Sequence, residues 1–505
     1  MAGMIIEKEI ANMATFLNYI YTNYKERTAF SFTAGNEQKE ITYGAFAADV
    51  NALRHDLQAR GYCHERIALI GENSYSWIVA YFAITTTQNT VVPLDREITL
   101  SEASRIVKEC ESRLLIHSAD YRSFAENLAA ETGIGLLPMT DFPVSGADFQ
   151  LLSETAENPD DIASIIYTSG TTGSAKGVQL RQKSICLDTI ITVERLDLWG
   201  STLLLLPFHH SYAWTATVMC SLLSGIILGI NQGMRYMMRD FQVIKPTTIF
   251  LVPLYVETFH KTLTREAEKQ GVSVASVAKA FFGGRLQVLV SGGAKLDGRY
   301  VDAYKQMGIE LLQGYGISEC SPVVAVNTIE RHRIGSVGPA LPHTQVKVRN
   351  PEDHGIGEIC VRGDIVMAGY LKNEKATADA FDGDWFRTGD LGYIDEDGFI
   401  FITGRIKNLI ILSNGKNVSA EELEQDLMRI AGITEVLVYE HEDKIMAEIF
   451  PDVAFWGTED EAQLQKLLWT PIEKDNAEKP MHKRIGELKI RLTEFPKTSS
   501  KKIKR

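Results

Sequence analysis

The chain has no excess of basic residues, no long apolar run and no paired cysteines. Its 505 residues include 52 basic and 65 acidic side chains, which gives a net charge of −13. That balance argues against a nucleic acid or an anionic membrane as the main partner. The longest apolar tract, residues 217–230, spans roughly 14 residues and contains serines and glycines, so it is too short for a transmembrane helix of about 20 residues. We expect no nucleic-acid partner and no transmembrane segment.

The spacing of the cysteines and the first residues of the chain indicate the cellular compartment in which the protein is expected. The six cysteines show neither a paired spacing nor a metal-binding pattern, which is typical of the reducing cytosol. Residues 1–9 lack the basic segment and the apolar stretch of a secretory signal. A cytoplasmic protein is therefore expected. For Cys320, which lies beside a motif described below, a buried neutral thiol is the expected state.

Strand and helix patterns alternate along the first 300 residues. Apolar positions at helical spacing occur between residues 46 and 57, and apolar strands are expected at residues 66–71, 90–94, 247–253 and 286–293. This alternation predicts an α/β fold with a parallel sheet that is covered on both faces. Ligands of such sheets bind at the carboxyl ends of the strands. The turn at Gly293 and Ala294, which follows the last of these strands, is therefore a candidate binding element.

The pattern changes twice further along the chain. Short strands at 345–348 and 358–362 and a hairpin around residues 395–398 predict a small β-barrel or distorted sheet. After Gly404 a small α+β unit is expected, with strands at 409–412, 435–439, 444–450 and 488–491. Its helix should begin at a capping box of Ser419 and Glu422. No repeat or low-complexity linker separates these parts.

The stretch at residues 167–177, Tyr-Thr-Ser-Gly-Thr-Thr-Gly-Ser-Ala-Lys-Gly, directly follows an apolar strand pattern at 162–166. Such a loop offers backbone N–H groups, rotatable hydroxyls and one cation, which together suit a phosphate group. It is not a Walker loop, because Gly177 stands where a magnesium-binding Ser or Thr is required. A flexible surface turn is the alternative. The expected phosphate-binding residues are Thr168, Ser169, Gly170, Thr171, Thr172, Gly173 and Lys176.

A second motif, Gln-Gly-Tyr-Gly-Ile-Ser-Glu, occupies residues 313–319. An aromatic ring between two glycines can present its face to a flat base. The hydroxyl of Ser318 and the carboxylate of Glu319 can reach a phosphate and its magnesium ion. The alternative is a glycine-rich turn with a solvated glutamate.

These two motifs resemble signatures of the adenylate-forming superfamily, which includes acyl-CoA synthetases, luciferases and nonribosomal adenylation domains. The first loop resembles YTSGTTGxPKGV, with Ala175 in place of proline, and the second resembles GYGxTE, with Ser318 in place of threonine. Residues 388–390, 404–408 and 413–418 resemble the family's TGD, GRxKD and SGxxV segments in the same order. The resemblance covers almost the whole chain.

The resemblance implies a role for each motif residue. Tyr315, between Gly314 and Gly316, would stack on adenine, Ser318 would contact the α-phosphate, and Glu319 would bind magnesium. Asp390 would accept hydrogen bonds from the ribose hydroxyls, and Arg405 would reach the ribose and phosphates. A small domain would swing about Lys407, and Gly415 would line the path of a pantetheine arm.

Residues 206–212, Leu-Pro-Phe-His-His-Ser-Tyr, resemble the family's PLxH segment, with His210 at the histidine position. An imidazole there can gate or orient the acyl carboxylate, whereas the alternative is a structural histidine at a strand end. Family members that activate amino acids carry an aspartate in this region, and this chain has none. An α-amino acid is therefore disfavoured. The acyl tail would lie near Tyr212, Trp214, Ser221, Ser224 and Gly225.

The end of the chain, residues 495–505, resembles PKTxxGKIxR and aligns the family's lysine with Lys502. A cation brought in by a mobile domain would neutralise charge as the carboxylate attacks the α-phosphate. Lys501 replaces the family's glycine. A solvated basic tail is the alternative.

Together these features predict an AMP-forming acid–thiol ligase that uses ATP, magnesium and coenzyme A. Residues 1–404 are expected to form the adenylation domain and residues 405–505 a mobile α+β domain. Among relatives the chain looks most like long-chain fatty acyl-CoA synthetases, so a medium- or long-chain fatty acid is the expected substrate. Two alternatives remain in the same chemistry, transfer to acyl carrier protein and arrest at the acyl-adenylate. A catalytically inactive nucleotide-binding scaffold is the alternative from another class.

Overall fold

The computed structural model describes residues 10–35, 37–143, 149–153, 158–168, 175–351, 355–412, 417–442, 444–497 and 503. The chain divides into two compact units. The first comprises Met1–Val346 and Val361–Phe386, and the second comprises Lys347–Cys360 and Arg387–Arg505. The boundary expected at residue 404 separates a body from a domain that moves against it, whereas this division separates groups of residues by their contacts. The boundary at residue 404 therefore stays a prediction.

One sheet of the first unit has seven strands in the order β17-β8-β7-β4-β3-β5-β6. The strands β3, β4, β5, β6 and β7 run parallel, and β8 returns antiparallel to β7. The expected strands at 66–71 and 90–94 are β3 and β4. The bounds are β3 (Arg66–Ile70), β4 (Thr90–Pro93), β5 (Leu114–His117), β6 (Gly135–Pro138), β7 (Ile162–Thr168), β8 (Lys176–Arg181) and β17 (Gly369–Tyr370).

The other large sheet has eight strands in the order β14-β13-β12-β11-β9-β10-β1-β2. Its six inner strands are parallel, and only the edge strands β14 and β2 pair antiparallel. The expected strands at 247–253 and 286–293 are β11 and β12. The bounds are β1 (Thr28–Ala34), β2 (Glu37–Thr42), β9 (Ser201–Leu204), β10 (Ile227–Ile230), β11 (Thr248–Leu251), β12 (Val288–Ser291), β13 (Glu310–Gly316) and β14 (Val323–Val326).

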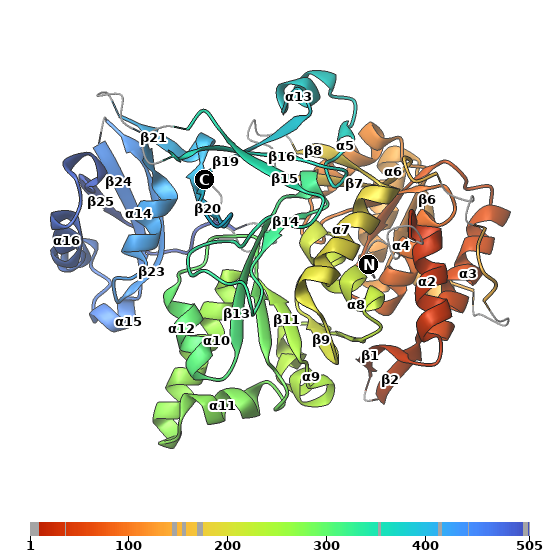
Figure 1. The fold of residues 1–505 in the computed structure, drawn as a ribbon, viewed down its shortest axis with the longest axis horizontal. Helices are drawn as coiled ribbons and strands as arrows, with labels where there is room; N and C mark the ends of the chain where they lie inside the picture. The colour runs from red at the N-terminus through yellow and green to blue at the C-terminus, as the bar shows by residue number, and fades with distance from the viewer. Residues whose placement is uncertain are drawn as a thin grey trace. The chain divides into compact units, whose positions relative to one another are not determined.

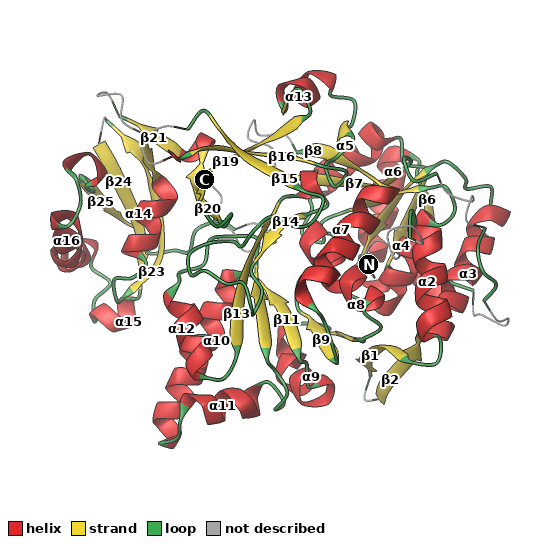
Figure 2. Cartoon of the chain, in the orientation of Figure 1, coloured by secondary structure: helices red, strands yellow, loops and turns green. Residues whose placement is uncertain are grey.

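Helices cover both faces of each sheet, as the alternating pattern predicts (Figures 1 and 2). Alternate strand residues face different cores because successive side chains of a strand point to opposite faces. In β3, Ile67 belongs to a core shared by the two sheets, and Ala68 belongs to a core with α5 and α6. In β11, Phe250 belongs to the shared core, and Ile249 packs with α9 to α12. The first unit is therefore a layered α/β body.

The helices of this unit differ in length and in how they begin. Asn12 caps α2, and Thr99 and Glu102 form a capping box on α5. The bounds are α2 (Met13–Tyr24), α3 (Tyr43–Ala59), α4 (Tyr75–Thr85), α5 (Leu100–Cys110), α6 (Arg122–Thr132), α7 (Gln182–Leu196), α8 (Cys220–Leu223), α9 (Met237–Ile244), α10 (Pro253–Gln270), α11 (Val274–Phe281), α12 (Arg299–Gln306) and α13 (Glu374–Asp379).

The apolar tract at 217–230 does not form one helix. It contains the end of a π-helical segment (Tyr212–Met219), then α8 and then β10. Among the described residues, no helix combines the length and apolar character needed to cross a membrane.

The second unit contains the short strands and the small α+β part expected from the sequence. The expected hairpin around residues 395–398 joins β19 to β20, and Ser419 accepts a hydrogen bond from the N–H of Glu422 at the start of α14. The bounds are β15 (Gln345–Arg349), β16 (Gly357–Arg362), β18 (Phe381–Asp382), β19 (Trp385–Ile394), β20 (Ile400–Arg405), β21 (Leu409–Ile411), β22 (Asn417–Ser419), α14 (Ala420–Leu427), β23 (Ile433–His441), β24 (Lys444–Pro451), α15 (Val453–Trp456), α16 (Glu461–Ala477) and β25 (Glu487–Ile490). Of these, β18 lies in the first unit, and β15, β16 and β19 each have residues in both units.

The core beneath α9 offers a test of the layered packing. Phe241 is fully buried, and its ring centroid lies 5.2 Å from that of Phe282 and 6.0 Å from that of Phe259. Replacing Phe241 with alanine leaves a cavity, so Phe241→Ala should lower the free energy of unfolding by about 3–5 kcal/mol. The control Val243→Ala changes a 46% exposed residue of the same helix and should cost less than about 0.5 kcal/mol. Denaturant unfolding followed by circular dichroism measures both, and equal losses would contradict the packing described.

Candidate active site

The hairpin of β7 and β8 brackets the expected phosphate-binding loop. Thr168, at the end of β7, pairs with Lys176, at the start of β8. The two residues therefore stand side by side at the base of the loop. The expected loop residues Ser169, Gly170, Thr171, Thr172 and Gly173 lie outside the described residues.

Tyr370 joins Lys176 to Glu319. The ammonium nitrogen of Lys176 lies 4.9 Å from the centroid of the Tyr370 ring, within range of a cation–π interaction. The Tyr370 hydroxyl donates a hydrogen bond to Oε1 of Glu319 at 3.0 Å. Burial of this hydroxyl and the adjacent Glu319 carboxylate raise the pKa of Tyr370. The hydroxyl is therefore protonated and acts as a donor. Two expected site residues that are distant in sequence meet at one tyrosine.

Backbone contacts fix the turn that carries Glu319. The carbonyl of Glu319 accepts a hydrogen bond from the N–H of Met367 at 2.8 Å. A Cβ at Gly316 would lie 2.0 Å from the carbonyl oxygen of Pro322, so only glycine fits where β13 approaches β14. Gly314 and Tyr315 precede it on β13, and all three are partly exposed at the carboxyl end of this parallel strand. Cys320 is fully buried, as expected.

The loop with the two histidines meets the same turn. The hydroxyl oxygens of Ser211 and Ser318 are 3.1 Å apart, which is hydrogen-bond distance. The Asn73 side chain holds this loop from both sides, because its amide nitrogen donates to the carbonyl of Leu206 at 2.8 Å and its oxygen accepts from the N–H of Phe208 at 3.1 Å. The expected acid-binding and nucleotide-binding segments are thus joined within the first unit.

His210 shares its place with a second histidine and an aspartate. The ring centroids of His209 and His210 are 4.2 Å apart. Oδ2 of Asp95, just beyond the carboxyl end of β4, lies 3.4 Å from Nε2 of His209. His209 is buried, whereas His210 and Asp95 are partly exposed. The three side chains place their ligand atoms within 4.8 Å of one another.

The turn after β12 is open to solvent. Gly293, with φ of +80°, and Ala294 are both exposed. Beneath them the partly buried Tyr212 donates hydrogen bonds to the carbonyl of Val290 at 3.0 Å and to that of Leu251 at 3.3 Å. These bonds tie the π-helical segment to the ends of β11 and β12.

The residues expected to surround an acyl tail lie mostly in the core. Trp214 is 3% exposed, and its ring centroid is 3.7 Å from that of Tyr81. Ser221 is fully buried and donates to the carbonyl of Thr217. A tail-binding pocket at these residues stays a prediction.

In the second unit, Asp390 and Arg405 meet across β19 and β20. Nε of Arg405 lies 2.7 Å from Oδ1 of Asp390, and the two residues are paired in the strand register. Asp390 is 2% exposed, whereas the Arg405 side chain is 44% exposed. Lys407 lies in an exposed turn just after β20. Gly415 is outside the described residues.

The end of the chain is held through Lys497. Its ammonium group pairs with Glu435 and lies 3.0 Å from Oε2 of Glu494. Lys497 also forms an isolated β-bridge with Ile503. Lys502 lies outside the described residues, so its role stays a prediction.

Sequence patterns did not reveal three residues of this site. Tyr370 lies in a two-residue strand, Asn73 lies in a turn, and Asp95 follows a strand without belonging to a motif. Asp95 could have been suspected, because it stands just after a predicted parallel strand, where ligand-binding residues gather.

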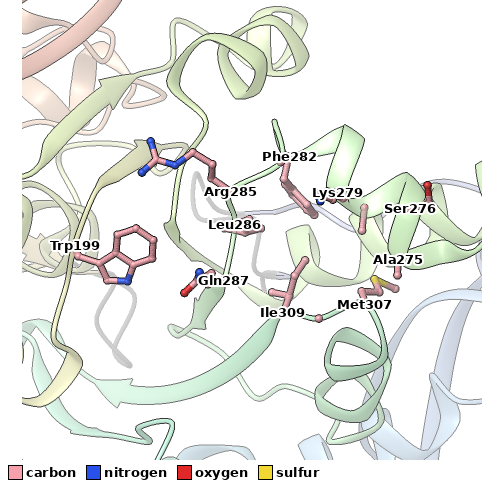
Figure 3. A pocket seen from close by; sticks show the side chains of 13 residues that line it. Trp199, Ala275, Ser276, Lys279, Phe282, Arg285, Leu286, Gln287, Met307 and Ile309 are labelled. Atoms are coloured by element: carbon pink, nitrogen blue, oxygen red, sulfur yellow. The ribbon is translucent and has the colours of Figure 1, made fainter.

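A separate surface depression of about 650 Å³ lies elsewhere on the first unit (Figure 3). Trp199, Gln287 and Ile309 line it, just before β9, β12 and β13 begin, and α11 closes another side. It therefore lies at the amino ends of the parallel strands, away from the motif residues at their carboxyl ends.

Comparisons with known proteins agree with this geometry. Residues 20–371 match the AMP-binding enzyme family, and residues 407–505 match the AMP-binding enzyme C-terminal domain. A long-chain-fatty-acid–CoA ligase of Mycobacterium tuberculosis is 29% identical over 81% of this chain and 82% of its own length. A 4-coumarate–CoA ligase of Arabidopsis thaliana is 27% identical over 87% of this chain and 83% of its own length.

Solved structures share the fold. The ATP-bound MatB of Rhodopseudomonas palustris superposes with a TM-score of 0.81 at 24% identity, over 97% of both chains. A fatty acyl CoA synthetase of Mycobacterium tuberculosis superposes with a TM-score of 0.72 at 22% identity, over 98% of this chain and 97% of that chain. The family match spans well over half of the chain, and the fold agrees across nearly all of it. The chain therefore belongs to the AMP-binding enzyme family.

Proposed function

We propose that this protein is an AMP-forming acid–thiol ligase. In the first step, a carboxylate oxygen of the acid attacks the α-phosphorus of ATP, and the bond to pyrophosphate breaks. In the second, the thiol of coenzyme A attacks the acyl carbon, AMP leaves, and the thiol proton passes to solvent. The observation that carries the proposal is the meeting of Lys176 and Glu319 at Tyr370.

The proposed triphosphate site has one cation and one carboxylate of fixed position. Lys176 would neutralise phosphate charge, and Glu319 would hold magnesium, for which a carboxylate oxygen is a suitable ligand. The ion would draw charge from the phosphates as pyrophosphate leaves. Tyr370 would aim the Glu319 carboxylate, because its donated hydrogen bond holds Oε1 in one position. Ser318 would contact the α-phosphate, and Tyr315 would stack on the base.

The remaining roles lie in the second unit and stay proposals from the family resemblance. Asp390 would bind the ribose hydroxyls, and the exposed Arg405 beside it would share its contacts with the nucleotide. Lys407 would serve as the hinge between domains 1–404 and 405–505, because an exposed turn tolerates a backbone change. Gly415 would line the pantetheine path, and Lys502 would act in adenylation.

The acid is proposed to be a medium- or long-chain fatty acid, in keeping with the long-chain-fatty-acid–CoA ligases among the relatives. His210 would orient its carboxylate. The six cysteines form no disulfide, which supports the expectation of a reducing cytosol.

A panel of acids tests the reaction. We expect AMP release from ATP in the presence of a fatty acid, with little release from aryl or short acids, and a marked increase when coenzyme A is added. Acyl-adenylate that accumulates with no effect of coenzyme A would point to a fatty acyl-AMP ligase, and a response to acyl carrier protein alone would point to carrier-protein transfer. If mass spectrometry finds no adenylate with any acid, the scaffold alternative is favoured and the ligase is excluded.

Tyr370→Phe removes one hydroxyl and keeps the ring beside Lys176. A hydrogen bond to a charged group contributes about 1.5–3 kcal/mol, so kcat/KM for ATP should fall roughly ten- to a hundred-fold. The magnesium concentration for half-maximal rate should rise as well, since the carboxylate loses its orientation. Tyr393→Phe, in a partly buried tyrosine of β19, is the control and should leave both quantities unchanged. An unaltered magnesium dependence in Tyr370→Phe would contradict the aiming role.

Lys502→Ala separates the two half-reactions. Losing a cation at the developing charge should lower the rate of adenylation by about 10²–10³. Thioester formation from supplied acyl-adenylate should be largely retained. Lys504→Ala, in the same basic tail, is the matched control. Equal losses in both half-reactions would argue against a role limited to adenylation.

A further inference from the structure

A cluster of three side chains in the first unit has the composition of a transition-metal site. Asp95, His209 and His210 each offer one ligand atom, and all three atoms lie within 4.8 Å of one another. The two histidines come from the loop after β9, and the aspartate follows β4. The cluster therefore lies at the carboxyl ends of strands from both large sheets.

The distance between two of the three ligand atoms already fits a bound metal ion. In a tetrahedral zinc site, bond lengths of about 2.0–2.1 Å place ligand atoms roughly 3.4 Å apart. The distance from Nε2 of His209 to Oδ2 of Asp95 is 3.4 Å. The ligand atom of His210 lies within 4.8 Å of the other two, so a side-chain rotation would bring it to the metal. Both His210 and Asp95 are partly exposed, so that rotation is not blocked on every side.

A buried nitrogen gives the second, independent indication. His209 is 9% exposed, and its Nε2 has no hydrogen-bond partner within the described part of the chain. Leaving a buried polar atom without a partner costs about 1–3 kcal/mol. The nitrogen faces Asp95, where a bound cation would satisfy it. An Asp–His ion pair alone accounts for the proximity of these two residues, but not for the presence of a His210 ring nitrogen within 4.8 Å of both.

We propose that Asp95, His209 and His210 bind one divalent transition-metal ion of the zinc class. Two imidazole nitrogens and one carboxylate oxygen are the donors that zinc and cobalt prefer, whereas magnesium prefers oxygen donors alone. Three protein ligands leave a coordination position open to water or to a carboxylate oxygen. This site is distinct from the magnesium site assigned to Glu319. If the proposed function holds, the ion and the acid share His210, and this consequence alone depends on it.

Cobalt provides a direct test that needs no catalysis. The purified full-length protein is titrated with Co²⁺ without ATP, acid or coenzyme A, and the visible absorption is recorded. We expect one equivalent to bind with the intense d–d bands of a four- or five-coordinate ion and without a thiolate charge-transfer band. Excess magnesium should not displace it, whereas Zn²⁺ should. Weak octahedral bands, or displacement by magnesium, would overturn the proposal.

Variants identify the ligands. His209→Ala and Asp95→Asn should each weaken Co²⁺ binding at least about 100-fold, since even outer-shell changes cost 10–100-fold. His55→Ala, which removes an exposed imidazole of α3, is the matched control and should bind as the parent does. Cys63→Ser tests the rival site at the exposed thiol of Cys63 and its neighbour His64. Thermal unfolding reports whether each variant is folded, and Asp95→Asn decides the matter if His209→Ala does not fold. Binding that survives in Asp95→Asn, or is lost in Cys63→Ser, would contradict the assignment.

Discussion

The hydrogen bond from Tyr370 to Glu319 is the contact on which the proposed nucleotide site depends. Backbone hydrogen bonds on both sides of Tyr370 hold this side-chain contact in place. The N–H of Leu371 donates to the carbonyl of Gly177, and the N–H of Met367 donates to that of Glu319, both at 2.8 Å. Residues 367–371 therefore bridge the strand that begins at Lys176 and the turn that carries Glu319. This bridge fixes the spacing between the cation and the carboxylate before any ligand binds, and such preorganisation is what charge stabilisation in a transition state requires.

Both carboxylates that are expected to act on the nucleotide are held by a donor from a neighbouring segment. Glu319 accepts from Tyr370 in the first unit, and Asp390 pairs with Arg405 in the second. Burying a carboxylate is costly unless donors compensate, so these partners stabilise the positions of the two side chains. The partners differ in kind. The tyrosine is partly buried and acts through one hydrogen bond, whereas the arginine is exposed and can extend toward a ligand while it keeps one contact.

Much of the fold follows from local sequence patterns, and the parts that do not follow depend on long-range register. Apolar strands between amphipathic helices predicted the parallel sheets, and the strands at β3, β4, β11 and β12 are confirmed. The glycine at position 316 was placed by its motif, and its close approach to Pro322 explains why no larger residue fits there. Tyr370 could not be predicted, because its role comes from the pairing of a two-residue strand with β8. Asn73 could not be predicted for a similar reason, since its two contacts with the loop are set by tertiary packing alone. The division of the chain into two compact units could not be predicted either. Hydrophobic periodicity indicates where strands and helices begin, but it does not indicate which segments contact one another.

The loop of residues 207–211 couples the two halves of the proposed chemistry. Ser211 contacts Ser318, which is expected at the α-phosphate, and its neighbour His210 belongs to the cluster with Asp95. Adjacent residues of a short loop cannot move independently when Asn73 clamps that loop at Leu206 and Phe208. Whatever fixes the imidazole of His210, whether an acid or a metal ion, therefore also constrains the Ser211 hydroxyl and, through it, Ser318. In the proposed site, occupancy at His210 would therefore be communicated to Ser318 through the single contact between the Ser211 and Ser318 hydroxyls.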